Sequence, residues 1–78
     1  MIKLKMIEID GTVTMIDAIE ADEGFLHMQP GALAACTEKG IHLYKDAGGS
    51  YYLADEDYNV LAVNMTLIKS YIKMFIMK

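Results

Sequence analysis

The sequence contains no arginine and no tryptophan, and it has one cysteine and one proline. Arginine and tryptophan are among the residues that most often anchor protein interfaces, so an interface on this chain must rely on tyrosine and methionine. The single cysteine, Cys36, excludes an intramolecular disulfide and agrees with a reducing compartment.

Features of a secretory signal peptide are missing near Met1, because Lys3, Lys5 and Glu8 interrupt the apolar residues there. No uncharged stretch reaches the roughly 18 residues that a membrane-spanning helix needs. We therefore expect a cytoplasmic protein that does not bind or cross a membrane. A length of 78 residues, with 54% hydrophobic and 23% charged residues, predicts one folded domain over residues 1–78 with little room for a deep pocket.

Basic side chains are absent from residues 6–38, which contain seven acidic residues. Residues 64–78 carry three lysines and no acid, and the net charge of the whole chain is −4. The simplest interpretation is a solvated acidic face that keeps a small domain soluble. The alternative is an acidic surface that binds a basic partner. Direct binding to DNA or RNA is disfavoured, because it needs clustered Lys or Arg facing the phosphates.

The strongest periodic signal lies in residues 65–78. At 100° per residue, Thr66, Lys69, Ser70 and Lys73 fall on one side of a helix. The other side is apolar and contains Met65, Leu67, Ile68, Tyr71, Ile72, Met74, Phe75 and Ile76. This apolar arc spans about 200°, whereas a helix on one sheet needs only about 100°. We expect a curved sheet that wraps the helix, a second copy of the chain, or a membrane or partner surface to cover the excess. Net negative charge opposes the membrane.

The start of this helix has two interpretations. Residues 61–67 also alternate as a strand does, which would delay the helix until Ile68. The other interpretation starts the helix near Met65. Asn64 or Thr66 could cap the helix, since either side chain can accept a hydrogen bond from a first-turn amide.

The first half of the chain predicts three strands over residues 2–9, 13–19 and 25–28, with a tight turn at Asp10 and Gly11. Residues 32–39 favour a short helix that ends at Gly40. Three further strands are expected over residues 41–45, 51–54 and 60–63, with Gly48 and Gly49 in the first turn between them.

These elements predict an α+β fold. It consists of a bent antiparallel sheet of about six short strands in two meanders, a short middle helix, and a C-terminal amphipathic helix packed on the sheet. An uncovered sheet edge could pair across a two-fold axis in a homodimer.

Three constellations resemble sites, and each match fails. Asp55, Asp57 and Asn59 fit the start of a calcium-binding loop, but Val60 and Thr66 stand where glycine and glutamate are required. This segment is better interpreted as a solvated turn. Cys36 with His27 or His42 matches neither a zinc pattern nor a cysteine-protease signature. Asp17, Glu20, Asp22 and Glu23 resemble any acidic turn. We expect no enzyme, no metal and no cofactor.

By exclusion, we expect a small acidic protein-interaction module. One form of this hypothesis is an inhibitor that blocks a basic nucleic-acid-binding surface of a partner protein. It rests on an analogy with small phage-encoded inhibitors. Its predicted partner-binding residues are Asp17, Glu20, Asp22, Glu23, Asp55, Glu56, Asp57 and Tyr58. The alternative is a structural or assembly protein that forms a homo-oligomer through a sheet edge and the C-terminal helix. The helix residues expected to form the core or the oligomer contact are Ile68, Tyr71, Ile72, Phe75 and Ile76.

Overall fold

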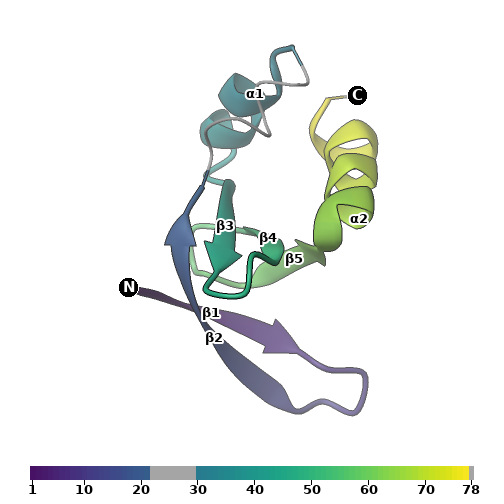
Figure 1. Cartoon of the computed structure of the whole chain (residues 1–78). Helices are drawn as coiled ribbons and strands as arrows, with labels where there is room; N and C mark the ends of the chain where they lie inside the picture. Colours follow the sequence, from purple (N-terminus) through teal and green to yellow (C-terminus); the bar gives the residue numbers. More distant parts are fainter. Residues whose placement is uncertain (22–29, 78) are drawn as a thin grey trace.

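A computed structural model describes residues 1–21 and 30–77 and has an α+β fold (Figure 1). Its elements, in chain order, are β1 (Ile2–Ile7), β2 (Val13–Glu20), α1 (Ala32–Glu38), β3 (His42–Asp46), β4 (Tyr51–Ala54), β5 (Val60–Val63), α2 (Asn64–Tyr71) and a π-helical continuation, η2 (Ile72–Ile76). The described residues therefore form five strands rather than about six, and the predicted strand over residues 25–28 lies outside them.

All five strands form one antiparallel sheet in the order β1-β2-β3-β4-β5. The sheet curls, with a register shift between Leu53 and Ala54, until its two ends meet. The amide of Lys5 in β1 donates a 2.8 Å hydrogen bond to the carbonyl of Tyr58, just before β5. A bulge of this kind bends a strand and increases its twist, so the irregularity in β4 favours the curl.

The three tight hairpins of the sheet share one turn geometry. In each, the first loop residue donates its amide to the carbonyl four residues later and accepts from the amide three residues later. The residue that donates this second bond, three residues after the first, has positive φ: 89° at Gly11, 85° at Gly49 and 66° at Tyr58. Glycine adopts this conformation without steric cost, whereas tyrosine does not. The prediction of a glycine turn at residues 10–11 is confirmed, and Tyr58 stands out as the exception.

The curled sheet buries side chains on both of its faces. Inside the curl, Leu4, Ala18, Tyr44 and Ala54 form one cluster. Neighbouring strand residues point to the opposite face, and there they pack under the helices in a larger cluster. That cluster contains Ala32, Cys36, Ile41, Leu43, Leu53, Ile68, Ile72 and Ile76. Full burial of each Leu or Ile contributes roughly 1.5–3 kcal/mol.

This arrangement corrects the expectation that the sheet wraps the C-terminal helix. The interior of the curl is filled by residues of the strands themselves, and both helices lie on the outer face of β3 and β4 (Figure 1). Successive strand residues are apolar, as at Leu43 and Tyr44, and supply one cluster each, so the sheet has an apolar face on each side. The helix therefore packs on the sheet, as predicted, but it is covered on one side only.

The short helix α1 ends in a hydrogen-bonded cap. The amide of Gly40 donates to the carbonyl of Thr37, and the amide of Ile41 donates to the carbonyl of Cys36. Gly40 has φ 72°, as a Schellman cap requires. Cys36 and Ile41 then meet in the larger core cluster, which confirms the predicted helix end and the interpretation of Cys36 as a small buried apolar residue.

The C-terminal helix begins at Asn64, so β5 does not continue into it. Asn64 itself has φ 57°, and its Oδ1 accepts a 3.0 Å hydrogen bond from the amide of Leu67. This bond satisfies one free amide of the first turn, as the earlier of the two predicted starts requires. From Ile72 onward the helix widens, and the amide of Met77 donates to the carbonyl of Ile72 five residues earlier.

Candidate interaction surfaces

The helix formed by α2 and η2 buries only part of its apolar arc. Ile68, Ile72 and Ile76 lie on one stripe and are buried in the larger core cluster. Tyr71 and Met65 are half-buried and pack against that cluster. Three large apolar residues remain open to solvent: Leu67 is 50% exposed, Met74 61% and Phe75 52%. Of the five helix residues predicted for a core or oligomer role, three lie in the core, Tyr71 lies at its margin, and Phe75 lies outside it.

The exposed residues line a shallow groove of about 240 Å³ between the helix and β5. We call it the helix groove; its lining residues are Leu61, Ala62, Leu67, Ser70, Tyr71, Met74 and Phe75. The rings of Tyr71 and Phe75 contact each other with centroids 4.8 Å apart. Exposed apolar residues that gather around a groove are typical of sites that bind another protein. Lys69 and Lys73 are both exposed but do not line the groove, because they lie on the polar side of the helix.

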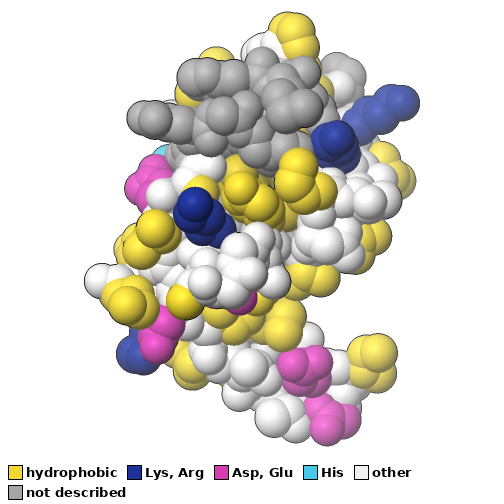
Figure 2. Space-filling view, viewed as in Figure 1, with side chains coloured by type: hydrophobic (Ala, Val, Ile, Leu, Met, Phe, Trp, Pro, Cys, Tyr) yellow, Lys and Arg dark blue, Asp and Glu magenta, His cyan; other side chains and the backbone are white. Residues whose placement is uncertain are grey.

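The β1–β2 hairpin carries a second set of exposed apolar residues. This hairpin projects away from the helices (Figure 1), and in Figure 2 its free end shows hydrophobic and acidic side chains together. Ile9 in its turn is fully exposed, Ile7 is 70% exposed, and Val13 and Met15 are half exposed. We call residues 7–13 the hairpin tip. The sequence pattern did not indicate this feature. Residues 7 and 9 were assigned to the predicted strand over residues 2–9, and the pattern does not show which face of that strand is covered.

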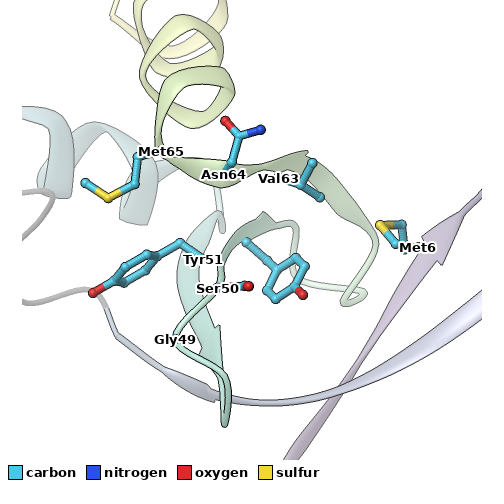
Figure 3. Close-up of a pocket in the computed structure, with 8 residues that line it drawn as sticks. Met6, Gly49, Ser50, Tyr51, Val63, Asn64 and Met65 are labelled. Carbon is cyan, nitrogen blue, oxygen red and sulfur yellow. The ribbon is translucent and has the colours of Figure 1, made fainter.

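A hollow of about 400 Å³ lies where β5 meets α2 (Figure 3). One side of the hollow is lined by Val63, Asn64 and Met65, and the turn before β4 contributes Ser50. Met6 of β1 also lines the hollow and lies apart from these residues. The described lining residues include no Asp, Glu, His, Lys or Cys. The hollow therefore offers no carboxylate, imidazole, amine or thiol for acid–base or nucleophilic chemistry, and its walls are mainly apolar.

The predicted acidic surface is divided by the fold. Asp17 on β2 forms an ion pair with Lys3 of β1, Nζ to Oδ1 2.6 Å. Glu20 lies near His42, Oε1 to Nδ1 3.4 Å, towards the opposite end of β3. Ala18 pairs with Asp46 at the end of β3 and Glu20 with Tyr44 at its middle. Asp17 and Glu20 are three residues apart on β2, so their side chains point to opposite faces of the sheet. Asp22 and Glu23 lie outside the described residues.

The turn from Asp55 to Asn59 uses its first carboxylate to hold itself together. Asp55 Oδ1 accepts hydrogen bonds of 2.9 Å from the amides of Asp57 and Asn59. This agrees with the interpretation of the segment as a solvated turn. The exposed residues of this turn are Glu56, Asp57 and Tyr58. The rings of Tyr58 and Tyr44 form a T-shaped pair, with centroids 6.4 Å apart. Among the predicted partner-binding residues, the structure brings these turn residues together.

Asp46 repeats this arrangement in the preceding turn. Its Oδ1 accepts from the amides of Gly48 and Ser50, and its Oδ2 accepts a 2.8 Å bond from the hydroxyl of Tyr52. The hydrogen bond from Tyr52, followed by that from Ser50, lowers the pKa of Asp46 below its usual value. The same bond from Tyr52, with some burial, raises the pKa of the Tyr52 hydroxyl.

The thiol and imidazole of the described residues lie in different surroundings. Cys36 is buried in the larger core cluster, and the Nδ1 of the half-buried His42 lies 3.4 Å from the Oε1 of Glu20. Across residues 1–21 and 30–77, no group of three or more His, Cys, Asp or Glu residues is arranged to hold a metal ion. His27 lies outside these residues.

Comparisons with protein-family models, with curated proteins and with solved structures find no match to this chain. In the described residues, no helix has the length and apolarity needed to cross a membrane.

Proposed function

We propose that this chain is a small protein-interaction module that assembles with further copies of itself through the helix groove. The observation that carries this proposal is the uncovered apolar arc. Leu67, Met74 and Phe75 follow the helical period, yet each keeps half or more of its surface in water. Apolar side chains gathered around a groove gain free energy when a partner covers them, by about 25 cal/mol per Å² removed from water.

The sheet supports the same proposal in a second way. Strands β1 and β5 are the two edges of the sheet and are joined by an isolated bridge at Lys5 and Asn59. The remaining backbone groups along an edge strand can pair with a strand of another chain. The helix groove adjoins β5 through Leu61 and Ala62, so a partner on the groove also lies beside this edge. We assign no catalytic activity to the module.

The test is the mass of the protein in solution. Sedimentation velocity and light scattering over a wide concentration range should give a multiple of the chain mass. Met74→Ser and Phe75→Ser should each shift the distribution towards the monomer, because both remove apolar surface that lies outside the core. Ile19→Ser is the matched control, since Ile19 is also about half exposed but belongs to β2. A wild-type protein that stays monomeric at every concentration would refute the proposal.

A second candidate function is the acidic inhibitor that covers a basic, nucleic-acid-binding surface of another protein. One observation favours it: Glu56, Asp57 and Tyr58 are exposed together in one turn. Acidic residues around a tyrosine can combine electrostatic steering with an aromatic anchor. In this form of the proposal, the turn carries the contact, whereas Asp17 and Asp55 are engaged with Lys3 and with backbone amides.

Affinity purification from the native host, with and without nuclease, tests this candidate. A stoichiometric nucleic-acid-binding partner, lost at high salt, would support it. Glu56→Gln combined with Asp57→Asn should then weaken the complex and flatten its salt dependence. Glu38→Gln with Asp10→Asn removes the same charge elsewhere and should leave the complex intact. Equal binding by both double variants would rule out the turn as the contact.

A further inference from the structure

The outer part of the β1–β2 hairpin is, among the described residues, a ribbon of two strands. Strand β3 pairs with β2 at residues 18–20, and the bridge between Lys5 and Asn59 joins β1 to the far edge of the sheet. The hairpin projects away from the helices (Figure 1). A two-stranded hairpin is marginally stable in water unless another layer covers one of its faces. What can cover this ribbon depends on the side chains of its two faces.

Register and pleat divide the side chains of the ribbon between these faces. Leu4 and Ala18 point into the curl and are buried there. Alternate residues point to the opposite face. We call this second face the arm face; its residues are Lys3, Lys5 and Ile7 of β1 and Val13, Met15 and Asp17 of β2. All six are exposed, and the three apolar ones keep half or more of their surface in water.

The residue pairs across the arm face are complementary in charge and polarity. The three pairs are Lys3 with Asp17, Lys5 with Met15, and Ile7 with Val13. The first is an ion pair, with Nζ 2.6 Å from Oδ1, and the last is apolar. A two-fold axis that runs along the ribbon places each strand of one copy over the other strand of a second copy, at the same level. Each residue then faces, in the second copy, the residue type that it already faces in its own.

We propose that the arm face of one copy packs on the arm face of a second copy around a two-fold axis along the ribbon. Lys3 of each copy then faces Asp17 of the other, and Ile7 faces Val13. The aliphatic stem of Lys5 covers the partner's apolar position while its ammonium group reaches water. Sheets that pack face to face keep their strand directions within about 30° of each other, as this arrangement does.

Charge selects this axis over an axis that runs across the ribbon. The second axis would place β1 on β1, with Lys5 against the same lysine of the other copy and Lys3 against Ile7. Like charges in contact oppose association, and an ammonium group covered by apolar atoms loses its hydration. The register that pairs these residues within one copy therefore makes the arm face complementary to itself, and this commits the face to a second copy of the chain.

This inference goes beyond the proposed function, because the arm face is separate from the helix groove. The described residues of the two surfaces do not overlap. Two strands present a small area, so the arm contact adds to the groove contact instead of replacing it. A chain that contacts different copies of itself through two surfaces builds assemblies larger than a dimer.

Charge reversal at one pair tests the arm contact. Asp17→Lys leaves only ammonium groups at this pair in two facing copies, and Lys3→Asp leaves only carboxylates. Each variant alone should lose about tenfold in its association constant at low ionic strength, and high salt should reduce this loss. An equimolar mixture should regain association near the wild-type level, because the ammonium groups of one variant then face the carboxylates of the other. A mixture that associates no better than its components would refute the inference.

Asp57→Lys is the matched control for Asp17→Lys, since it makes the same change in net charge at an exposed residue of another turn. It should associate as the wild type does and should gain nothing when mixed with Lys3→Asp. The side chains of Lys3 and Asp17 are 64% and 55% exposed, so the fold tolerates the loss of their ion pair, and circular dichroism verifies this. A control weakened as strongly as Asp17→Lys would make net charge the cause and overturn the inference.

Met15→Ser tests the apolar part of the contact, with Ile19→Ser as its control. Ile19 is equally exposed but lies beyond the arm face, beside Lys45 of β3. In sedimentation velocity, Met15→Ser should lower the mass of the largest species, and Ile19→Ser should not. If Phe75→Ser lowers the mass and Met15→Ser does not, the proposed function stands and the arm contact is wrong. The reverse result would uphold the arm contact against the groove contact, and a wild-type monomer at every concentration would refute both.

Discussion

The backbone amide of Lys5 lies 2.8 Å from the carbonyl oxygen of Tyr58, and this hydrogen bond joins the first strand to the turn that precedes the last. Tyr58 holds that position with φ 66°, where the two equivalent turns have glycine. The ring of Tyr58, although exposed, forms a T-shaped contact with the buried ring of Tyr44, with centroids 6.4 Å apart. A residue in a costly backbone conformation therefore lies where the sheet closes on itself, and its carbonyl and its ring both contribute to the closure.

Substitutions at Tyr58 should separate its backbone cost from its ring contact. Tyr58→Ala and Tyr58→Gly both remove the ring, but glycine adopts positive φ without the roughly 1–2 kcal/mol steric cost. Its larger unfolded-state entropy offsets about 0.5–1 kcal/mol of that gain. Urea denaturation should therefore show the Gly variant more stable than the Ala variant by roughly 0.5–1 kcal/mol. A Gly variant less stable than the Ala variant by about 0.5–1 kcal/mol would mean that this turn carries no strain.

Gly49→Ala should lower the stability of the fold, because it adds a side chain at a position of positive φ in the preceding turn. Gly49 has φ 85°, and a Cβ built there meets no atom within 4 Å. Any loss of stability must then come from the backbone conformation, and we expect roughly 0.5–1 kcal/mol in the same urea titration. Gly48→Ala tests the neighbouring glycine, whose φ is not positive and whose built Cβ lies 3.4 Å from Asp46 Oδ1. A change at Gly48 as large as that at Gly49 would contradict the assignment.

The pair formed by Asp46 and Tyr52 predicts two pH windows. The folded-state pKa of Asp46 is lowered, first by the Tyr52 hydroxyl, so its contribution to stability is present above pH 3.8 and is lost as pH falls further. The folded-state pKa of Tyr52 is raised, so its contribution is present below pH 10.0 and is lost as pH rises through the raised value. Melting temperature against pH should decline in both windows.

Tyr52→Phe is the variant that tests this pair. It removes the alkaline decline that Tyr52 causes, and it weakens the acidic decline because Asp46 loses its largest stabilising hydrogen bond. Asp10 also has a lowered pKa, so part of the acidic decline persists in this variant. An alkaline limb identical to that of the wild type would show that Tyr52 does not titrate in it.

Asp55 should matter for stability far more than Asp57. Asp55→Ala deletes a carboxylate that accepts two backbone amides and the side-chain amide of Asn59. Bonds of this kind contribute roughly 1–2 kcal/mol together at a partly exposed site. Asp57→Ala leaves the bond from the Asp57 amide in place and should change the free energy of unfolding by less than about 0.5 kcal/mol. Equal losses in chemical denaturation would refute the structural role of Asp55.

Shortening a side chain to alanine should cost more stability on the buried side of the C-terminal helix than on its exposed side. Ile72 is fully buried, so Ile72→Ala should cost about 2–5 kcal/mol of unfolding free energy. Phe75 is half exposed and contacts Tyr71, so Phe75→Ala should cost about 1 kcal/mol in the monomer. Denaturation at low protein concentration measures both values. Similar losses at the two positions would place Phe75 in the core and remove the basis of the helix groove.

Local elements could be predicted because their causes lie within a few residues. The boundaries of α1, β3, β4 and β5 follow from alternation, from Gly40 as a helix cap and from Gly49 in a turn, and the structure places them within one or two residues of the predictions. The start of the C-terminal helix had two interpretations, and the structure favours the earlier one. A turn could be assigned to Asp55, Asp57 and Asn59, because Val60 and Thr66 stand where a calcium-binding loop requires glycine and glutamate. The width of the apolar arc on residues 65–76 was also visible as a local pattern.

The sequence by itself determined which segments are helices, strands and turns, because backbone preference and side-chain period act between near neighbours. Only the tertiary structure decided that Ile68, Ile72 and Ile76 face the core while Phe75 faces water, because burial depends on where β3 and β4 place their own apolar side chains. It also decided that Asp17 pairs with Lys3, fourteen residues away in the chain. The register of the β1–β2 hairpin sets that contact, and sequence spacing does not reveal it.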